Sequence, residues 1–325
     1  MYQAMDSRFR GNDNQGYKAD VTAESTFIEM MRCMARDPAA RALMDDAAVL
    51  ELGDATLILT HDLMAEDVHW LPKADPADVA WKLVSVNLSD LAAKGARPLG
   101  VLLGFMLGDS HWDKRFAEGL ERVLAHYAVP LLGGDTVSNK GDKRAVGMTA
   151  IGAATHRPVP ARSGARAGDV LYVTGTLGDA LAGFELAEAG LEGVDELSSA
   201  YHRPVARLSD GQALAPNVTA MMDVSDGLLL DAERMAAASK VAIRVNIDAI
   251  PLSAAYRAMR GDSLDSRLQA ASWGDDYQLL FTAPTGIALP VPATAIGHVN
   301  EGSGLALFEA DAPIPLPSSL GYQHH

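Results

Sequence analysis

The hydrophobic positions of this chain switch repeatedly between a two-residue and a helical spacing, which predicts strands and helices mixed along most of its length. Short β-rich runs at 47–52 and 56–60 flank Gly53-Asp54, a turn signal that predicts a hairpin. Asp75-Pro76 predicts the start of a long helix, because Asp is a favoured N-cap and Pro fits the first helical position. That helix should end at Gly95. The other elements predicted in this half are a helix at 22–34, a strand at 99–106, a helix at 111–127, a buried strand at 129–132 and a strand at 145–154.

A second half repeats this mixture after a polar segment at 156–168, which holds two prolines, two glycines and three arginines. We therefore predict a fold of the α/β (α+β) class with two mixed α/β domains, at 22–155 and 169–325, joined by a linker at 156–168. Residues 1–21 are polar and mixed in charge, which predicts a disordered N-terminal extension. Predicted elements of the second half include a strand at 169–174, a helix at 177–189, a helix beginning at Pro204, a strand at 219–222, a helix at 228–239 and strands at 241–247, 277–282, 294–299 and 305–308.

Charge and cysteine content narrow the class of protein. The 325 residues are 48% hydrophobic, enough for two packed cores, and they carry a net charge of −15. This charge argues against a nucleic-acid partner, and no apolar run approaches the length of a membrane span. A single cysteine, Cys33, excludes a disulfide within one chain and fits a reducing, cytoplasmic location. An anionic substrate is still compatible with this charge, because bound Mg²⁺ can reverse the local field.

Short acidic motifs lie where predicted strands and helices end. Buried carboxylates are rare unless they are paired or bound to a cation, and several of them in one cleft would repel each other. A hard divalent cation relieves that repulsion, and Mg²⁺ commonly brings phosphates with it. The usual glycine-rich phosphate loops are absent from the sequence, so the pattern predicts a Mg-nucleotide enzyme of another kind. The motifs are Asp45-Asp46, His61-Asp62, Asn87-Leu88-Ser89-Asp90, Gly133-Gly134-Asp135, Asp223-Val224-Ser225-Asp226-Gly227 and Gly274-Asp275-Asp276-Tyr277.

Most of these motifs have an ordinary structural alternative. Ser225 or Asp226 could simply cap the next helix, whereas Asp223, still at the end of its strand, is harder to explain as a cap. Asp90 could form a surface pair with Lys94, although a carboxylate near a helix C-terminus is disfavoured by the helix dipole. Arg162 is either a phosphate clamp or a solvated charge of the linker. The alternatives of ligand contact and ordinary turn also stay open for Gly133-Gly134-Asp135 and for His69.

Taken in order, the motifs resemble the thiamine-monophosphate kinase family, within the aminoimidazole-ribonucleotide-synthetase-like superfamily. The resemblance runs from Phe27 to the C-terminus, and its longest motif is the helix from Val86 to Pro98. It implies ATP-dependent phosphorylation of thiamine monophosphate to thiamine diphosphate by direct, in-line transfer. Several Mg²⁺ ions, ATP as co-substrate and a homodimer formed through strands of the N-terminal domains are implied with it. The alternatives are another ATP-dependent synthetase of the same superfamily and a non-catalytic regulator that binds Mg-nucleotide.

The resemblance also assigns roles to residues, three of them catalytic. The Mg²⁺ ligands it implies are Asp45, Thr60, Asp62, Asp90, Asp135, Asp223 and Asp226. The catalytic residues among these are Asp135, Asp223 and Asp226. The contacts to ATP it implies are Gly134, Asp135, Arg162 and Ser225, and those to the thiamine substrate are His69, Gln278 and Tyr322. The chain departs from the family pattern at Met44 and Asp67, where Gly is usual, and at Gln278, which lacks the charge of the usual Glu.

Overall fold

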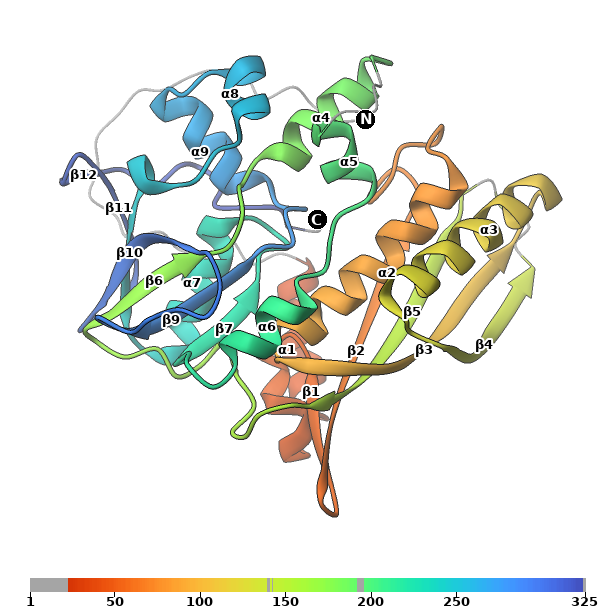
Figure 1. Cartoon of the computed structure of the whole chain (residues 1–325), viewed down its shortest axis with the longest axis horizontal. Coiled ribbons are helices and arrows are strands. Elements are labelled where there is room, and N and C mark those ends of the chain that lie inside the picture. Colours follow the sequence, from red (N-terminus) through yellow and green to blue (C-terminus); the bar gives the residue numbers. More distant parts are fainter. Residues whose placement is uncertain (1–22, 139–140, 142, 192–195, 324–325) are drawn as a thin grey trace.

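The protein is described by a computed structural model that covers residues 23–138, 141, 143–191 and 196–323. Two β-sheets, each with helices packed against it, form two mixed α/β halves, as the sequence predicts (Figure 1). The predicted N-terminal extension at 1–21 lies outside the described residues. Within the described part, none of the helices combines the length and apolarity that crossing a bilayer requires.

The N-terminal sheet has five strands in the order β1-β2-β5-β3-β4. β1 and β2 form the predicted hairpin, and the Asp75 carboxylate accepts the backbone N–H of Ala77 at the start of α2. α2 is buried along most of its length because it packs against α3, against the sheet and against α6 and β7 of the second half. The elements of this half are α1 (Ala23–Arg32), η1 (Pro38–Leu43), β1 (Ala48–Leu52), β2 (Ala55–Ala65), α2 (Pro76–Ala93), β3 (Ala96–Leu107), α3 (Ser110–Tyr127), β4 (Leu131–Ser138) and β5 (Ala145–Ala154).

Strand β4 corrects the prediction of a buried strand that ends before Gly133. β4 is the edge strand of the sheet, every one of its residues is exposed in the single chain, and it continues through Gly133 to Ser138. Asp135 therefore lies within a strand, opposite Gly104 of the parallel strand β3, and not in a turn. An apolar run indicates that a strand needs cover, but it does not tell whether the same chain supplies that cover.

The second sheet has seven strands in the order β12-β11-β8-β10-β6-β9-β7. The predicted helix start at Pro204 is wrong, because Pro204 lies in the irregular connection between α5 and α6. The elements of this half are β6 (Asp169–Val173), α4 (Asp179–Glu188), α5 (Glu196–His202), α6 (Leu208–Leu214), β7 (Ala220–Asp223), α7 (Leu228–Ser239), β8 (Ala242–Asn246), η2 (Ile247–Ala249), α8 (Ala254–Arg260), α9 (Leu264–Trp273), β9 (Leu279–Pro284), β10 (Thr294–Asn300), β11 (Gly304–Glu309) and β12 (Ala312–Ile314).

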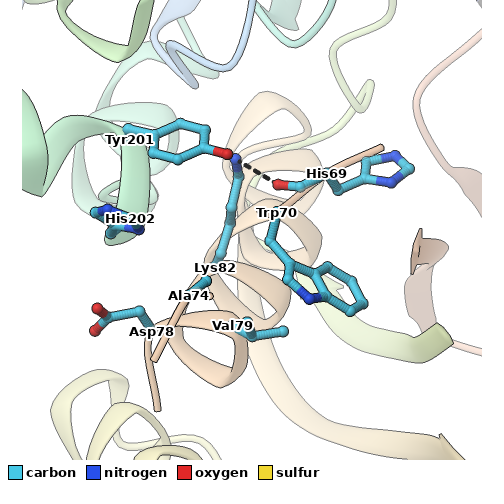
Figure 2. Close-up of a pocket in the computed structure, with 8 residues that line it drawn as sticks. All are labelled: His69, Trp70, Ala74, Asp78, Val79, Lys82, Tyr201 and His202. Atoms are coloured by element: carbon cyan, nitrogen blue, oxygen red, sulfur yellow. Dashed lines mark hydrogen bonds between the residues drawn. The ribbon is translucent and has the colours of Figure 1, made fainter. Parts of the chain in front are cut away.

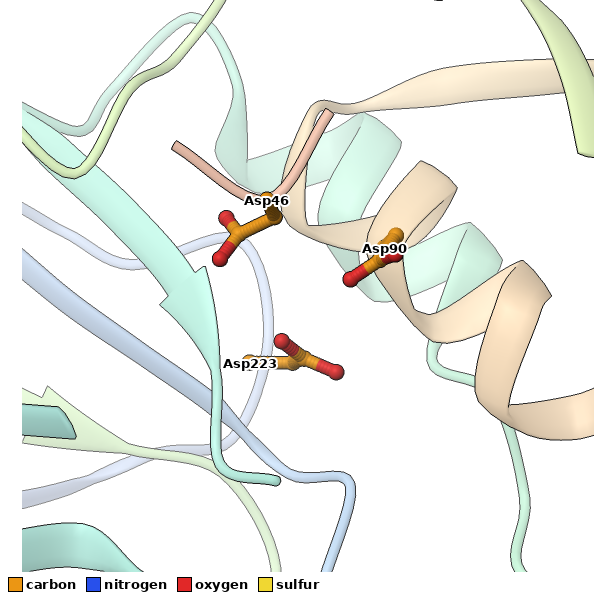
Figure 3. A group of neighbouring side chains, drawn as sticks. All are labelled: Asp46, Asp90 and Asp223. Atoms are coloured by element: carbon orange, nitrogen blue, oxygen red, sulfur yellow. The ribbon is translucent and has the colours of Figure 1, made fainter. Parts of the chain in front are cut away.

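An apolar cluster joins the two halves where α2 ends. Ala92 and Ala93 of α2 pack with Leu214 of α6 and with Met221 and Phe281 of the second sheet, all fully buried. Burial of this kind fixes the C-terminal end of α2 against the end of β7. The two halves therefore present Asp90 and Asp223 to the same space (Figure 3).

Candidate active site

Three carboxylates converge between the two halves of the molecule. Asp46 lies in the segment before β1, Asp90 in the last turn of α2 and Asp223 at the end of β7 (Figure 3). One oxygen from each lies within 4.8 Å of the others. Hard oxygen donors at this spacing suit a divalent cation such as Mg²⁺, which prefers carboxylate ligands. We refer to these three residues as the acid triad.

The acid triad carries more negative charge than the neighbouring positive groups neutralise. Burial, together with the nearby Asp46 carboxylate, raises the pKa of Asp223 to about 8. Burial and the charges of Asp62 and Asp223 raise the pKa of Asp90 well above its usual range. Burial would also raise the pKa of Asp46, but the charges of Arg162 and Lys94 outweigh it and lower that pKa. A divalent cation would supply the missing positive charge.

Strand β2 adds two of the predicted ligands beside the triad. The Thr60 hydroxyl donates a hydrogen bond to the Asp90 carboxylate. The backbone N–H of Asp62 donates to the side-chain oxygen of Asn87 over 3.1 Å, which joins β2 to α2. Burial, Asp226 and Asp46 together raise the pKa of Asp62 to about 6, so this carboxylate shares the field of the triad.

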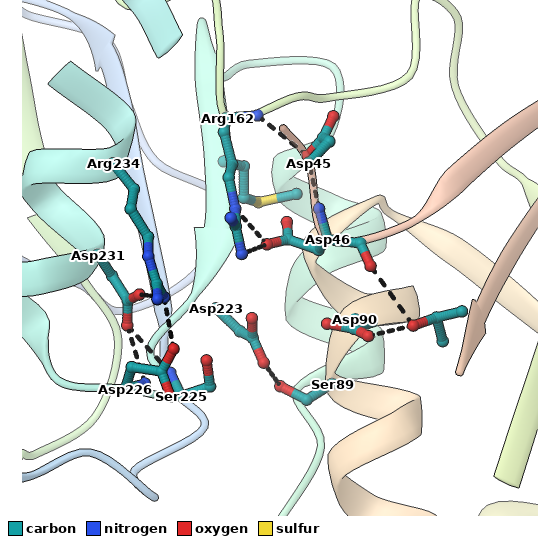
Figure 4. Close-up of polar contacts among 12 residues, drawn as sticks. Asp45, Asp46, Ser89, Asp90, Arg162, Asp223, Ser225, Asp226, Asp231 and Arg234 are labelled. Atoms are coloured by element: carbon teal, nitrogen blue, oxygen red, sulfur yellow. Dashed lines mark hydrogen bonds and ion pairs between the residues drawn. The ribbon is translucent and has the colours of Figure 1, made fainter. Parts of the chain in front are cut away.

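The loop after β7 is held in place by side chains of α2 and α7. Ser89 donates to Asp223 Oδ2 over 2.6 Å, and Asp231 Oδ2 accepts the backbone N–H groups of Ser225 and Asp226 over 3.1 and 3.2 Å (Figure 4). Arg234 bridges Asp231 and Asp226 at 2.9 and 2.5 Å. The alternative that Ser225 or Asp226 caps α7 is wrong, because Gly227 is the N-cap residue and no side chain caps this helix.

Two motif glycines let the loop after β7 touch the segment before β9. Gly227 has φ 114° and Gly274 has φ 98°, and a Cβ on Gly274 would lie 2.4 Å from the Ser225 carbonyl oxygen. Next to them, Asp275 and Tyr277 also have positive φ, 61° and 48°, which is unusual for residues with side chains. Strained backbone of this kind gathers at functional sites, where the surrounding structure enforces it.

Arg162 points into the acid cluster. Its Nε donates to Asp46 Oδ1 over 2.6 Å, and the alternative of a solvated linker charge is therefore wrong (Figure 4). Asp45 lies outside the triad, because its two oxygens pair with Arg41 and Lys94, each at 2.5 Å. The surface pair between Asp90 and Lys94 is likewise replaced by a buried contact of Lys94 with Asp45 and Asp46.

A small pocket near the start of α2 contains His69 (Figure 2). The Lys82 ammonium lies in it, 2.6 Å from Asp275 Oδ2, 3.1 Å from the His69 carbonyl oxygen and 4.3 Å from the centre of the Tyr201 ring. The His69 ring is oriented by its Nδ1, which accepts the backbone N–H of Ala65 over 3.1 Å. The turn before His69 contains Asp67 with φ 67°, the left-handed conformation that a Gly would adopt freely.

The remaining predicted residues lie in three different settings. The side-chain oxygen of Gln278 accepts hydrogen bonds from Thr174 and Arg207 over 2.9 and 3.0 Å, so it braces the second sheet. Tyr322 is partly exposed, and its backbone N–H donates to the Asp226 carbonyl oxygen over 2.9 Å, beside the loop after β7. Gly134 and Asp135 lie on the exposed edge strand β4, and within one chain Asp135 is not part of the acid triad.

Sequence reasoning missed four residues that the structure brings into this region. Asp46 and Asp45 are adjacent and identical, so the sequence does not tell which of them lies beside Asp90 and Asp223. Asp275 belongs to one of the acidic motifs, but the resemblance implies no role for it. The sequence indicates Lys94 only as a motif residue and a surface partner of Asp90, and Asp231 carries no signal beyond its charge; the fold shows that both are buried.

Comparison with known proteins identifies the class of fold. The family model for the N-terminal domain of AIR synthase related proteins matches residues 44–154, and that for the C-terminal domain matches residues 166–312. The structure titled "AaThiL complexed with AMPPCP and TMP" has a TM-score of 0.81 and 29% sequence identity, covering 96% of this chain and all of that chain. The two-sheet architecture is thus that of the AIR-synthase-related proteins.

Sequence relatives define the family within that class. The thiamine-monophosphate kinase of Haemophilus influenzae is 35% identical over 310 residues, which cover 87% of this chain and 93% of the relative. That of Salmonella typhimurium is 36% identical over 303 residues, covering 86% and 90%. The chain belongs to the thiamine-monophosphate kinase family, a family of phosphotransferases.

Proposed function

We propose that this enzyme transfers the terminal phosphoryl group of ATP to thiamine monophosphate, in line and without a phosphoenzyme, to form thiamine diphosphate. The acid triad carries this proposal, since three buried carboxylates from separate elements meet beside Arg162 and the Ser225 loop. Family membership supports the substrate, and the related structure with an ATP analogue (AMPPCP) and TMP supports the pair of ligands. Phosphoryl transfer needs mainly positioning and neutralisation of charge, which such a site supplies.

The donor set fits Mg²⁺. Asp46, Asp90 and Asp223 would hold it, with Thr60, Asp62 and Asp226 as further expected ligands close by. When bound, Mg²⁺ neutralises phosphate charge and makes the transferred phosphorus more electrophilic. The expected ligand Asp45 is the weakest member of the predicted set, because its oxygens pair with Arg41 and Lys94 and it is not among the acids that meet at the triad.

The residues of the chain position the phosphates. Arg162 presents a planar guanidinium at the edge of the triad, and this group suits an anionic oxygen better than a point charge does. Ser225 offers its hydroxyl from a loop whose backbone Asp231 fixes. Because Asp231 is fully buried and receives two backbone N–H groups and Arg234, the loop keeps its shape before substrate arrives.

The thiamine end of the substrate would lie toward the pocket of His69. This placement rests on the resemblance, which assigns His69 to the thiamine substrate, because the Lys82 ammonium already fills the space between Asp275 and the Tyr201 ring. His69 and Tyr322 remain the expected contacts. Gln278 has its oxygen engaged by Thr174 and Arg207, which makes direct substrate contact there the least supported of the three.

We further propose a homodimer built on the N-terminal sheet. The strands of this sheet expose large apolar side chains, which a soluble single chain rarely leaves uncovered. They are Leu63, Leu102, Leu131, Leu132 and Val137. Gly134 and Asp135 lie on the same strand β4 as three of them, so their predicted contacts with ATP and Mg²⁺ would be made at the active site of the partner.

One cysteine per chain agrees with a cytoplasmic location.

The test is a coupled ADP-release assay with Mg-ATP and thiamine monophosphate, in which thiamine diphosphate is quantified by chromatography. We expect one diphosphate per ADP, and no product from thiamine or from aminoimidazole ribonucleotide precursors. Asp90→Ala should abolish turnover, while the matched control Asp265→Ala, an exposed acid on α9, should retain it. ATP binding without any product would favour the non-catalytic regulator, and turnover of another substrate would favour another synthetase of the superfamily.

A further inference from the structure

Lys94 is a fully buried lysine at the edge of the acid cluster, and the proposed reaction gives it no role. It is the C-cap residue of α2, and its side chain has 0% exposure. Its Nζ lies 2.5 Å from Asp45 Oδ1, 2.5 Å from Asp46 Oδ2 and 3.3 Å from the carbonyl oxygen of Met221. Asp45 Oδ1 and the Met221 carbonyl oxygen accept hydrogen bonds from this ammonium group, and Asp46 Oδ2 forms an ion pair with it.

The surroundings of Lys94 resemble those of a bound metal ion. Two carboxylates and one backbone carbonyl are the ligands that a hard divalent cation takes from proteins. A buried ammonium is stable only when anions surround it, and Asp45 and Asp46 both supply negative charge at contact distance. The side chain is anchored by the last turn of α2, so this positive charge is present whether or not the solution contains divalent ions.

Asp46 is shared between the two environments. Its Oδ2 faces Lys94 and its Oδ1 faces Arg162, while one of its oxygens also lies within 4.8 Å of the triad oxygens of Asp90 and Asp223. Asp45 has no such second environment, because it is not among the acids whose oxygens meet within 4.8 Å, and its other oxygen pairs with Arg41. A divalent ion that reached the space between Asp45 and Asp46 would have to displace the ammonium of Lys94.

We propose that Lys94 is a permanent internal cation that occupies the place of a divalent ion between Asp45 and Asp46. Divalent ions then bind only on the side of Asp46 that faces Asp90 and Asp223. The inference rests on the proposed function for the existence of a divalent site at the triad. Under this proposal Asp46 is available to the divalent site and Asp45 is not one of its ligands.

The test is Lys94→Met, which keeps an unbranched apolar stem and removes the charge. Mn²⁺ binding is measured without nucleotide by isothermal titration calorimetry and by electron paramagnetic resonance, with melting curves in chelator and in Mn²⁺. We expect Lys94→Met to bind one Mn²⁺ more than the wild type. Its melting temperature in chelator should fall by about 5 °C or more, and Mn²⁺ should restore most of the loss. The control Lys114→Met removes an exposed lysine of α3 and should change neither quantity.

A second variant separates the proposal from a general loss of stability. Asp45→Asn with Lys94→Met removes one acid of the vacated place, so the additional Mn²⁺ should disappear. Equal Mn²⁺ stoichiometry in the wild type and Lys94→Met overturns the proposal. It is also overturned if the double variant keeps the additional ion, or if Lys94→Met stays unfolded in Mn²⁺ as well as in chelator. A wild type that binds no Mn²⁺ overturns the metal site of the proposed function, and this inference with it.

Discussion

Replacing Asp223 by Asn should make the metal-free protein more stable and inactive at the same time. Asp223 is 2% exposed at the end of β7, and its carboxylate has Asp46 and Asp90 as neighbours. An Asn side chain has nearly the same shape. Its oxygen can accept the hydrogen bond from Ser89, and its N–H₂ group can donate to the neighbouring carboxylates. The substitution therefore removes a buried charge without leaving a cavity.

The pKa of Asp223 sets the size and the pH dependence of this effect. Its rise from 3.8 to about 8 disfavours the ionised form by at most about 6 kcal/mol, at ~1.4 kcal/mol per pKa unit. Relaxation and water entry reduce this, so we expect Asp223→Asn to stabilise the metal-free protein by about 2–5 kcal/mol above pH 8. Because the folded state holds this proton more tightly than the unfolded state, wild-type stability falls as pH rises from 4 to 8, and the advantage of the variant vanishes near pH 4.

The assay is thermal unfolding in chelator at several pH values, repeated with Mg²⁺. At pH 8.5 the variant should melt about 5–10 °C above the wild type in chelator. Mg²⁺ should raise the melting temperature of the wild type and have little effect on the variant, because binding to the folded state stabilises it. A variant that melts below the wild type at pH 8.5 in chelator would refute the claim that burial of this charge destabilises the metal-free site.

Two further predictions concern residues whose roles are less direct. We expect Asp135 to act in the active site of the partner chain. The inactive variants Asp135→Ala and Asp223→Ala, mixed and allowed to exchange subunits, should then regain about a quarter of wild-type activity. A mixture that stays inactive would place Asp135 in the site of its own chain or outside any site. Gln278→Glu should change the KM for thiamine monophosphate by less than about threefold, because Thr174 and Arg207 can hold a carboxylate oxygen as they hold the amide oxygen; steady-state kinetics showing a large rise in KM would contradict this.

The sequence predicted the elements well where local signals are strong. The Gly53-Asp54 hairpin, the Asp75 cap of α2 and the strand at 145–154 follow from turn chemistry, capping and apolar periodicity, which act within a few residues. The prediction failed for β4, since burial depends on what covers a strand. It also failed at Pro204, because a proline fits an irregular connection as well as a helix start.

The sequence predicts which residues form the candidate site, but not which of its acids pair with positive side chains and which meet at the triad. Motif order identified Asp90, Asp223 and Arg162, which the structure does bring together around Asp46. Both Asp45 and Asp46 pair with Lys94, and the choice between them depends on which one also lies beside Asp90 and Asp223. That choice is made by packing between segments more than 40 residues apart, and adjacent identical residues give no local signal of it.

The same geometry explains why such a site can persist although it destabilises the metal-free chain. Burial, together with the neighbouring acids, raises the pKa of Asp90 and of Asp223, so folding without a cation is opposed at neutral pH. Apolar packing of α2 against both halves of the molecule holds these acids together nonetheless, since Ala92 and Ala93 are buried against Met221. Binding of a divalent ion, with the phosphates that accompany it, would relieve this unfavourable charge, and this relief favours binding. The last turn of α2 therefore serves both needs: Ala92 and Ala93 stabilise the fold by apolar packing, and Asp90 supplies a carboxylate to the site.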